Sequence, residues 1–307
     1  MKRGLVLGAL LAIGGFSLVA GGLQQRQGGG GGQGRGGPQG PPVAQIEKVK
    51  DNLYMIIGGG GNTAAFITDA GVVVVDTKLA GWGQAILDKI KTVSDKPVTM
   101  LINTHTHPDH TGSNEFFPAT VEVVAQEVTK ANMEKMDAFK GDKAKFLPKK
   151  TFKDKMTLGK GKDEIDLFYF GRGHTGGDAW VLFPALRVLH AGDLFAGKTT
   201  PLIDTMNGGS AVEYGKTLAK AYSTLKNYDT IITGHSPLMK PADLKEYADF
   251  NNDFITWVQG EIKAGKTVDA VAAEFKIPEK YKGYTPGPAL FGGVKGNIQT
   301  AYNELKK

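Results

Sequence analysis

Six consecutive residues, HTHPDH, place four potential metal ligands directly after the apolar run Val98–Ile102, which has the composition of a buried strand. The ligand-type side chains are His105, His107, Asp109 and His110. Neutral imidazole and carboxylate groups suit zinc and similar divalent cations. His105 and His107 share a face if the backbone is extended, and the two residues after the proline can then point to a second ion. The hexapeptide therefore predicts a metal site at the end of a strand, where the mount is rigid.

Three later residues of ligand type stand in a similar local setting. His174 lies in GHTGGD, Asp193 follows the apolar strand predicted at Val188–His190, and His235 follows the one at Thr230–Thr233. Each stands next to glycine at the end of a strand or in a turn. Taken alone, each is more typical of a loop, core or capping residue than of a ligand. Together with the hexapeptide, they favour a metal cluster assembled from several strand ends.

The hydrophobic periodicity predicts an α/β domain in two halves, with strands that deliver polar residues at their ends. The predicted strands are Ile46–Val49, Leu53–Ile57, Thr63–Thr68, Val72–Val75, Val98–Ile102, Val121–Ala125, Ile165–Phe170, Ala179–Phe183, Val188–His190 and Thr230–Thr233. The predicted helices are 82–90, Glu127–Phe139, Ala211–Leu225, Ala242–Lys263, Val268–Phe275 and Asn297–Lys306. A second autonomous domain is not needed.

The first 42 residues do not read as part of this domain. A basic start, an apolar run and the small residues Ala20-Gly21-Gly22 predict a secretory signal peptide over 1–22, with a retained membrane anchor as the alternative. Residues 23–42 are rich in glycine and proline and predict a linker without a core. The folded domain then covers 43–307, and the protein is expected to be exported to the periplasm or secreted.

The motif series HTHPDH, GHTGGD, AGDLF and TGHS, with VVVVDT at 72–77, resembles the metallo-β-lactamase superfamily over about residues 46–240. The resemblance implies an αββα sandwich, with a dinuclear metal site at one edge. It also implies that Asp76 is a buried hydrogen-bonding support and that His190 matches no ligand position. The implied ligands are His105, His107 and His174 for the first metal, Asp109, His110 and His235 for the second, and Asp193 as the bridge.

The implied cofactors are two zinc ions, with iron or manganese as alternatives, because ligand identity sets only a preference. Two such ions lower the pKa of a shared water, so that a bridging hydroxide becomes the nucleophile. Asp109 would orient that hydroxide, which gives it a catalytic role as well as a ligand role. The implied reaction is metal-dependent hydrolysis.

The expected substrate is a small carbonyl compound: an ester, thioester, lactone or β-lactam. A β-lactamase proper is one alternative, and export favours it. The chain has no cysteine, which excludes the cysteine-using subclass, and Asp193 departs from the HxHxDH β-lactamases that commonly lack a bridging aspartate. The alternative from another class is a metal-binding protein on the same fold that has no catalytic turnover.

The net charge of +6 does not indicate nucleic-acid binding, because the lysine-rich stretch Lys135–Lys162 has no interleaved aromatic pattern. We expect this stretch to be a solvated helix and loop face, with attraction to anionic substrates or to the cell surface as the alternative. Two glycine-rich loops, Gly58–Asn62 and Asn207–Ser210, are candidate elements near the pocket, and an ordinary tight turn is the alternative for each. The only partner expected is a small-molecule substrate; the oligomeric state stays open, and a cleaved signal peptide would leave no stable membrane partner.

Overall fold

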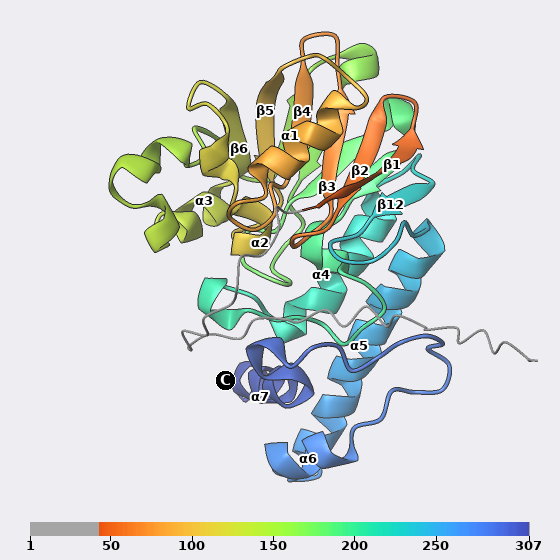
Figure 1. Ribbon diagram of the computed structural model, residues 1–307. Helices are drawn as coiled ribbons and strands as arrows, with labels where there is room; N and C mark the ends of the chain where they lie inside the picture. The colour runs from red at the N-terminus through yellow and green to blue at the C-terminus, as the bar shows by residue number, and fades with distance from the viewer. Residues whose placement is uncertain (1–42, 307) are drawn as a thin grey trace, which may run out of the picture. The chain divides into compact units, whose positions relative to one another are not determined.

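The computed structural model of the protein describes residues 43–306. Two β-sheets pack face to face, and helices cover the outer face of each (Figure 1). The order of layers is helix, sheet, sheet, helix, which is the predicted αββα sandwich. The predicted signal peptide and linker lie outside the described residues.

The first sheet has seven strands in chain order, antiparallel from β1 to β4 and parallel from β4 to β7. Its strands are β1 (Gln45–Lys50), β2 (Leu53–Ile57), β3 (Thr63–Ile67), β4 (Val72–Val75), β5 (Val98–Asn103), β6 (Glu122–Gln126) and β7 (Lys150–Phe152). Because β4, β5 and β6 are parallel, their carboxyl ends meet at one edge of the sheet. The HTHPDH hexapeptide begins at that edge.

The second sheet has five strands in the order β12-β11-β10-β9-β8, of which only β11 and β12 pair in parallel. Its strands are β8 (Lys155–Leu158), β9 (Ile165–Phe168), β10 (Trp180–Phe183), β11 (Val188–His190) and β12 (Thr230–Ile232). The parallel pair brings the carboxyl ends of β11 and β12 together, so the loops that carry Asp193 and His235 start side by side.

The helices lie mainly outside the sheets. They are α1 (Gly83–Lys91), α2 (Pro108–Thr111), α3 (Glu127–Met133), α4 (Ala211–Thr224), α5 (Pro241–Lys263), α6 (Val268–Glu274) and α7 (Gly293–Leu305). The helix α1 packs Ile86 and Ile90 against the outer face of the first sheet, while α4, α5 and α7 bury the outer face of the second. Between the sheets lies a third apolar cluster that includes Phe66 and Phe183, whose rings are 5.0 Å apart.

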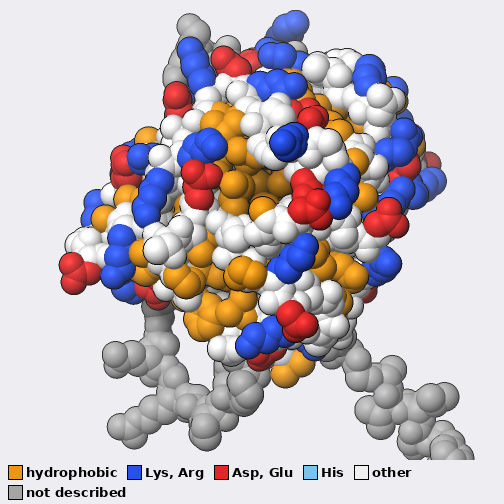
Figure 2. Space-filling model, turned by 90° about the horizontal axis from the view of Figure 1, so that it is seen from above, with side chains coloured by type: hydrophobic (Ala, Val, Ile, Leu, Met, Phe, Trp, Pro, Cys, Tyr) orange, Lys and Arg blue, Asp and Glu red, His pale blue; other side chains and the backbone are white. Residues whose placement is uncertain are grey.

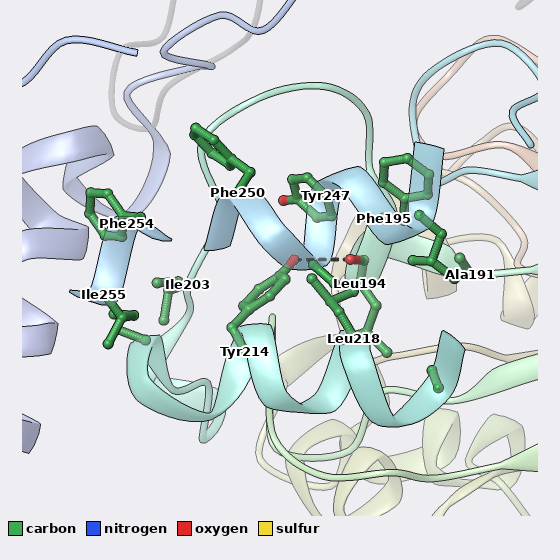
Figure 3. Packing of buried hydrophobic residues seen from close by; sticks show 14 of the residues in the cluster. Ala191, Leu194, Phe195, Ile203, Tyr214, Leu218, Tyr247, Phe250, Phe254 and Ile255 are labelled. Atoms are coloured by element: carbon green, nitrogen blue, oxygen red, sulfur yellow. Dashed lines mark hydrogen bonds between the residues drawn. The ribbon is translucent and has the colours of Figure 1, made fainter. Parts of the chain in front are cut away.

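The cluster on the second sheet also supports the turn that carries Asp193. In Figure 3, Leu194 and Phe195 of this turn lie among side chains of α4 and α5. The ring of Phe195 stacks on Tyr247 at 4.9 Å. The hydroxyl of Tyr214 donates to the carbonyl of Asp193 at 2.9 Å and also approaches that of Leu194 at 3.4 Å. The backbone beneath the candidate ligand is therefore held by a packed core.

The strand and helix assignments made from the sequence are confirmed with shifts of a few residues at their ends, apart from two corrections. The helix predicted at Glu127–Phe139 ends at Met133, and a separate 3₁₀ turn covers Asp137–Phe139. The stretch Lys135–Lys162 is not only helix and loop, because it contains the strands β7 and β8. These strands are three and four residues long, and their lysines face solvent. Such short strands at sheet edges leave little hydrophobic periodicity to detect.

The sandwich also has a pocket of about 690 Å³ at the end opposite to the hexapeptide. Apolar side chains such as Val73, Met100 and Leu158 contribute to its lining, and Asp69 and Lys162 pair at 2.8 Å beside it. Figure 2 looks onto this end of the molecule and shows an apolar hollow ringed by charged side chains. Among the described residues, no helix is both long and apolar enough to cross a membrane.

Candidate metal centre

The four ligand-type residues of the hexapeptide lie at the carboxyl end of β5. His105 follows the strand, His107 precedes the first turn of α2 in extended backbone, and Asp109 and His110 lie within that turn. Pro108 occupies the first helical position, where no backbone N–H is required. This strand-to-helix change separates the two pairs of ligands, which lets one short segment serve two neighbouring positions.

The remaining three candidates come from the second half of the chain. His174 lies in the loop between β9 and β10, Asp193 in the 3₁₀ turn Gly192–Phe195 after β11, and His235 after β12. All seven side chains predicted from the sequence converge at one edge of the sandwich. The donor atoms of His105, His107, His174 and Asp193 all lie within 4.8 Å of one another, and so do those of Asp109, His110 and His235.

The first group is a tight triangle of imidazole nitrogens. The Nδ1 atom of His107 is 3.2 Å from Nε2 of His105 and 2.9 Å from Nε2 of His174. Asp193 closes the group from one side, with its Oδ2 atom 3.6 Å from Nε2 of His174 and 4.0 Å from Nε2 of His105.

The second group shares that same carboxylate. Oδ1 of Asp193 is 3.2 Å from Nε2 of His110, and its Oδ2 is 3.2 Å from Nε2 of His235. Oδ2 of Asp109 is 3.3 Å from Nε2 of His235 and 3.7 Å from Nε2 of His110. Asp193 therefore lies between the two groups, which is the position of a bridging ligand.

The outer nitrogens of four histidines are each held by an acceptor in the chain. Nδ1 of His174 is 2.7 Å from the carbonyl of Leu202, and Nδ1 of His110 is 2.7 Å from Oδ2 of Asp76. Because a carbonyl or carboxylate oxygen only accepts, the ring nitrogen donates in both cases. In the neutral ring this leaves the lone pair on Nε2, which faces the cluster. A metal ligand needs this tautomer, and such outer acceptors commonly fix it.

Asp76 is the support that the resemblance implied. It lies fully buried at the end of β4, and it accepts hydrogen bonds from the backbone N–H of Thr104 at 2.8 Å and from the Thr104 hydroxyl at 2.7 Å. Since that hydroxyl gives its proton to Asp76, it accepts from Nδ1 of His105 at 3.0 Å. One buried carboxylate thus orients His105 through Thr104 and His110 directly.

Asp204 contacts the cluster, and the sequence did not point to it. Its Oδ2 atom accepts from Nε2 of His107 at 2.7 Å and from the Asn207 side chain at 2.6 Å. Its Oδ1 atom accepts from the backbone N–H groups of Met206 and Asn207. The loop Asn207–Ser210, a candidate from the sequence, is thereby tied to a ligand. No motif surrounds Asp204, so no sequence signal pointed to it.

The electrostatics of the cluster suit a cation. Burial, helped by the neighbouring His107, lowers the pKa of His174 to about 4, and burial also lowers the pKa of His105. Burial would raise the pKa of Asp109, but the charges of His110 and the hydrogen bond from His235 outweigh it and lower the pKa to about 2. The result is neutral imidazoles beside ionised carboxylates.

His110 and His235 show the opposite shift. Burial acts to lower both pKa values, but Asp193 and the other carboxylates overcome it: the pKa of His110 rises well above its usual range, and that of His235 rises to about 9. The field of the carboxylates thus holds positive charge at this place, as a proton or as a metal ion.

The residues present fit a pair of divalent cations. Oδ1 of Asp193 is buried, and no described residue donates a hydrogen bond to it. It lies 3.2 Å from Nε2 of His110, and when that ring is neutral and donates from Nδ1 to Asp76, Nε2 presents a lone pair to Oδ1 and cannot donate to it. An unpaired buried carboxylate oxygen is costly unless a cation or a proton compensates it. The donor set of five imidazoles and two carboxylates is one that zinc and similar ions prefer.

The glycine-rich turn Gly58–Asn62 packs directly against the ligand loops. The N–H of Gly61 donates to the carbonyl of Asp109 at 3.0 Å, and a Cβ atom at Gly61 would lie 2.1 Å from the ring of His110. The side chain of Asn62 donates to the carbonyls of Thr233 and Ser236, on either side of His235. The turn is therefore clamped onto the cluster by hydrogen bonds.

Lys78 is a second residue near the cluster whose position the sequence did not indicate. It is fully buried, and its Nζ atom donates to the carbonyls of Ile56 and Gly61, each at 2.8 Å. Burial lowers its pKa to about 7, against the opposing effect of Asp76 and Asp109. A lone lysine after VVVVDT gave no signal of burial, because lysine is usually a surface residue.

His190 lies outside the cluster. It is fully buried, Nε2 donates to the carbonyl of Asn62 at 3.1 Å, and Nδ1 accepts from the N–H of Gly192 at 3.1 Å. Both ring nitrogens are thus used within the chain, which is what a structural histidine requires.

Comparisons with known proteins agree with this architecture. The profile of the metallo-β-lactamase superfamily matches residues 57–235, more than half of the chain. The chain is 25% identical over 229 residues to the metallo-β-lactamase type 2 of Elizabethkingia meningoseptica, covering 69% of this chain and 87% of that protein. It is 22% identical over 284 residues to a linear primary-alkylsulfatase of Pseudomonas sp., covering 76% of this chain and 53% of that protein.

Solved structures show the same fold. A mutant of the sec-alkyl sulfatase PisA1 superimposes with a TM-score of 0.72 at 16% identity, covering 85% of this chain and 50% of that one. The DIM-1 metallo-β-lactamase gives a TM-score of 0.56 at 21% identity, covering 68% of this chain and 98% of that one. The chain thus spans about half the length of the alkylsulfatases.

The chain belongs to the metallo-β-lactamase superfamily. It is a metal-dependent hydrolase of that superfamily, with a His/Asp cluster that is suited to metal ions.

Proposed function

We propose that the protein is an exported dinuclear zinc hydrolase that acts on a small carbonyl substrate. The observation that carries this proposal is the convergence of seven donors around the shared carboxylate of Asp193. Outer acceptors already turn the inner nitrogens of the histidines toward one another. A site of this kind holds metal without reorganisation, which favours tight binding and a fixed geometry.

His105, His107 and His174 would hold the first ion, and Asp109, His110 and His235 the second, with Asp193 between them. When bound, the two ions would lower the pKa of a shared water toward neutrality and so supply a hydroxide nucleophile. The chain itself would supply imidazole rings in fixed orientations and the buried carboxylate of Asp193 between the two ions.

Asp109 is suited to orienting the attacking water. Its side chain is 29% exposed, whereas that of Asp193 is 4% exposed, so it is the more accessible of the two carboxylates. The pKa of Asp109, lowered to about 2, keeps it ionised and able to accept a hydrogen bond at neutral pH. His235, 35% exposed, lies beside it, which places the open side of the site at the second group.

The hydrogen bonds of the basic side chains near the cluster favour a neutral substrate over an anionic one. Lys78 gives its hydrogen bonds to backbone carbonyls beneath the glycine turn, and the guanidinium of Arg172 donates to the carbonyls of Gly208 and Gly209. Both side chains are thus engaged by the chain, and burial lowers the pKa of Lys78 to about 7. A neutral ester, thioester, lactone or β-lactam does not need a cationic partner. Sulfate ester hydrolysis is the second candidate, because the likeness to an alkylsulfatase extends over 85% of this chain.

The test is turnover of a panel of chromogenic substrates: an ester, a thioester, a lactone, a β-lactam and an aryl sulfate. We expect hydrolysis of at least one carbonyl substrate, abolished by a chelator and restored by zinc. Preferred turnover of the aryl sulfate would replace the carbonyl proposal. Two bound metals with no turnover on any substrate would support a metal-binding protein without catalysis.

Export rests on the N-terminal sequence, whose basic start, apolar run and Ala20-Gly21-Gly22 are typical of a cleaved signal peptide. Mass spectrometry of the mature protein from the native cell should show a chain that begins near residue 23. A full-length chain in the membrane fraction would support the retained anchor.

A further inference from the structure

The C-terminal part of the chain returns to the metal cluster through one aromatic side chain. The ring of Phe291 stacks on that of His107, with centroids 5.3 Å apart and an angle of 19° between planes. It also meets the ring of His174 edge-on at 6.2 Å. Phe291 is nonetheless 42% exposed, and its neighbour Leu290 is 46% exposed. An apolar surface therefore lies over the first ligand group and faces solvent.

The backbone at this point is held in an unfavourable conformation. Phe291 has φ 54° and ψ 26°, in the left-handed region that residues other than glycine avoid, and Gly292 and Gly293 follow with φ of 85° and 57°. A left-handed phenylalanine costs on the order of 1 kcal/mol or more. Such local strain persists where the surrounding structure fixes it, and it often marks a functional position.

One segment, Lys198–Asp204, anchors both the metal cluster and the C-terminal arm. Its Leu202 carbonyl accepts from His174, and its Asp204 carboxylate accepts from His107. The same segment pairs with Thr285 by backbone hydrogen bonds at 3.1 Å, and its Pro201 carbonyl accepts from the Asn297 side chain at 2.7 Å. The short arm between Thr285 and Asn297 is thus fixed at both ends to the support of two ligands. The segment Lys198–Asp204 therefore fixes the position of Phe291 relative to His107.

We propose that Phe291 is a specificity-determining residue that receives the apolar group of the substrate. This inference rests on the proposed function, because it concerns the substrate of that same site. The ring of Phe291 covers the first ligand group, at His107 and His174. In the second ligand group, Asp109 and His235 are partly exposed to solvent. A substrate that enters over the second group would place its reacting carbonyl between the groups and an alkyl or aryl substituent against Phe291. The substrate class is therefore a carbonyl compound with an apolar acyl group.

The test compares alkyl hydroxamates of increasing chain length, which chelate metals, by titration calorimetry on the zinc-loaded protein. In the wild-type protein, each added methylene should tighten binding by up to about fourfold, which is the effect of burying one methylene. The same series of p-nitrophenyl esters, from acetate to hexanoate, should show a falling KM with little change in kcat.

The variant Phe291→Asn removes the apolar ring, and asparagine tolerates the left-handed backbone. We expect it to keep two metals per chain and to lose the dependence on chain length in both assays. Phe291→Tyr should retain the dependence. The matched control is Phe116→Asn, another half-exposed phenylalanine at 41%, whose ring packs beside Phe117 and Gly83. If Phe291→Asn does not fold, Phe291→Gly serves as the second variant, because glycine adopts this backbone without strain.

Each outcome decides one of the two proposals. An unchanged chain-length dependence in Phe291→Asn, or no such dependence in the wild-type protein, overturns the role of Phe291. Chain-length-dependent hydroxamate binding that Phe291→Asn loses, without hydrolysis of any ester, thioester, lactone or β-lactam, supports the apolar wall and contradicts the carbonyl hydrolase.

Discussion

Individual side chains in the cluster are oriented by partners that lie outside it. Four histidine rings each use one nitrogen for a hydrogen bond to the chain, which leaves the other nitrogen to face the centre. In His107 the roles of the two nitrogens are reversed, and Asp204 is the partner that fixes this reversal. Metal binding by these rings depends on the proton of each outer nitrogen, which the supporting residue keeps on that nitrogen.

The first prediction concerns Asp204→Asn. The two oxygens of Asp204 accept four hydrogen bonds, and an amide cannot accept on both atoms. Either the turn after residue 204 or the tautomer of His107 is disturbed. We expect metal affinity to fall by about 10- to 100-fold, which is typical when an outer partner of a ligand is lost. Competition with a chromophoric chelator measures it.

Asp229→Asn is the matched control for that variant. Asp229 is a half-exposed carboxylate paired with Lys50 and Arg187 at 2.9 Å. The Asp229→Asn variant should bind metal with the affinity of the wild-type protein. Equal affinities in both variants would contradict the role of Asp204.

The second prediction concerns the pH dependence of stability at Lys78. Its pKa is about 7 in the folded protein and near 10.5 when unperturbed. Between these values the unfolded chain holds a proton that the folded chain has released, so this group makes the free energy of unfolding rise with pH, by up to about 1.4 kcal/mol per unit. Lys78→Met should lack this contribution. Urea unfolding of both proteins at pH 7.5 and 9 measures the difference, and parallel pH profiles would disprove it.

At the scale of elements, each ligand loop starts at the carboxyl end of a strand or lies between strands, and close backbone approaches bring the loops together. Gly234 shows how tight this approach is. A Cβ atom there would lie 1.9 Å from Oδ1 of Asp193 and 2.8 Å from the carbonyl of Gly192. The loops after β11 and β12 can thus meet only because glycine precedes His235.

The third prediction is that Gly234→Ala pushes the Asp193 loop away and lowers the metal content to about one ion or fewer per chain, with a lower melting temperature. Gly260→Ala is the control, because a Cβ atom within α5 at this position meets nothing within 4 Å. It should keep both metals and gain about 0.5–1 kcal/mol, since alanine is favoured over glycine in a helix. Elemental analysis and thermal unfolding compare the two. Two retained metals in Gly234→Ala would show that the loops tolerate the added methyl group.

The elements most visible in the sequence were those with long apolar runs. Val72–Val75 is buried throughout, and β5 becomes buried from Leu101 onward, toward the end that carries the hexapeptide. Strands that are buried on both faces read as continuous hydrophobic segments. The strands β7 and β8 escaped detection because they are short and rich in lysine. Lys78 and Phe291 escaped for another reason: their environments are set by tertiary contacts between segments far apart in the chain.

For the whole molecule, the two halves of the sandwich each supply part of the cluster. The first sheet carries four of the candidate ligands and the second half of the chain three, and the apolar layer between the sheets holds them together. The convergence of the seven candidate ligands could be predicted because the motifs are local and specific. Their outer partners could not, because Asp204 and Leu202 lie in a segment with no motif of its own.

The fourth prediction concerns metal removal. A ligand that binds only the folded state stabilises it by about 2.7 kcal/mol when present at 100 times its dissociation constant. For a domain of this size we expect chelation to lower the melting temperature by roughly 5–10 °C. Added zinc should restore it. Scanning calorimetry with and without chelator is the measurement, and an unchanged melting temperature would argue against metal ions as part of the folded structure.

The central claim is that seven side chains hold two divalent cations. Elemental analysis of the purified wild-type protein at neutral pH tests it most directly. We expect two ions per chain, and the proposed function adds that zinc is the main element. A content well below one ion per chain, after incubation with zinc and removal of the excess, would contradict it.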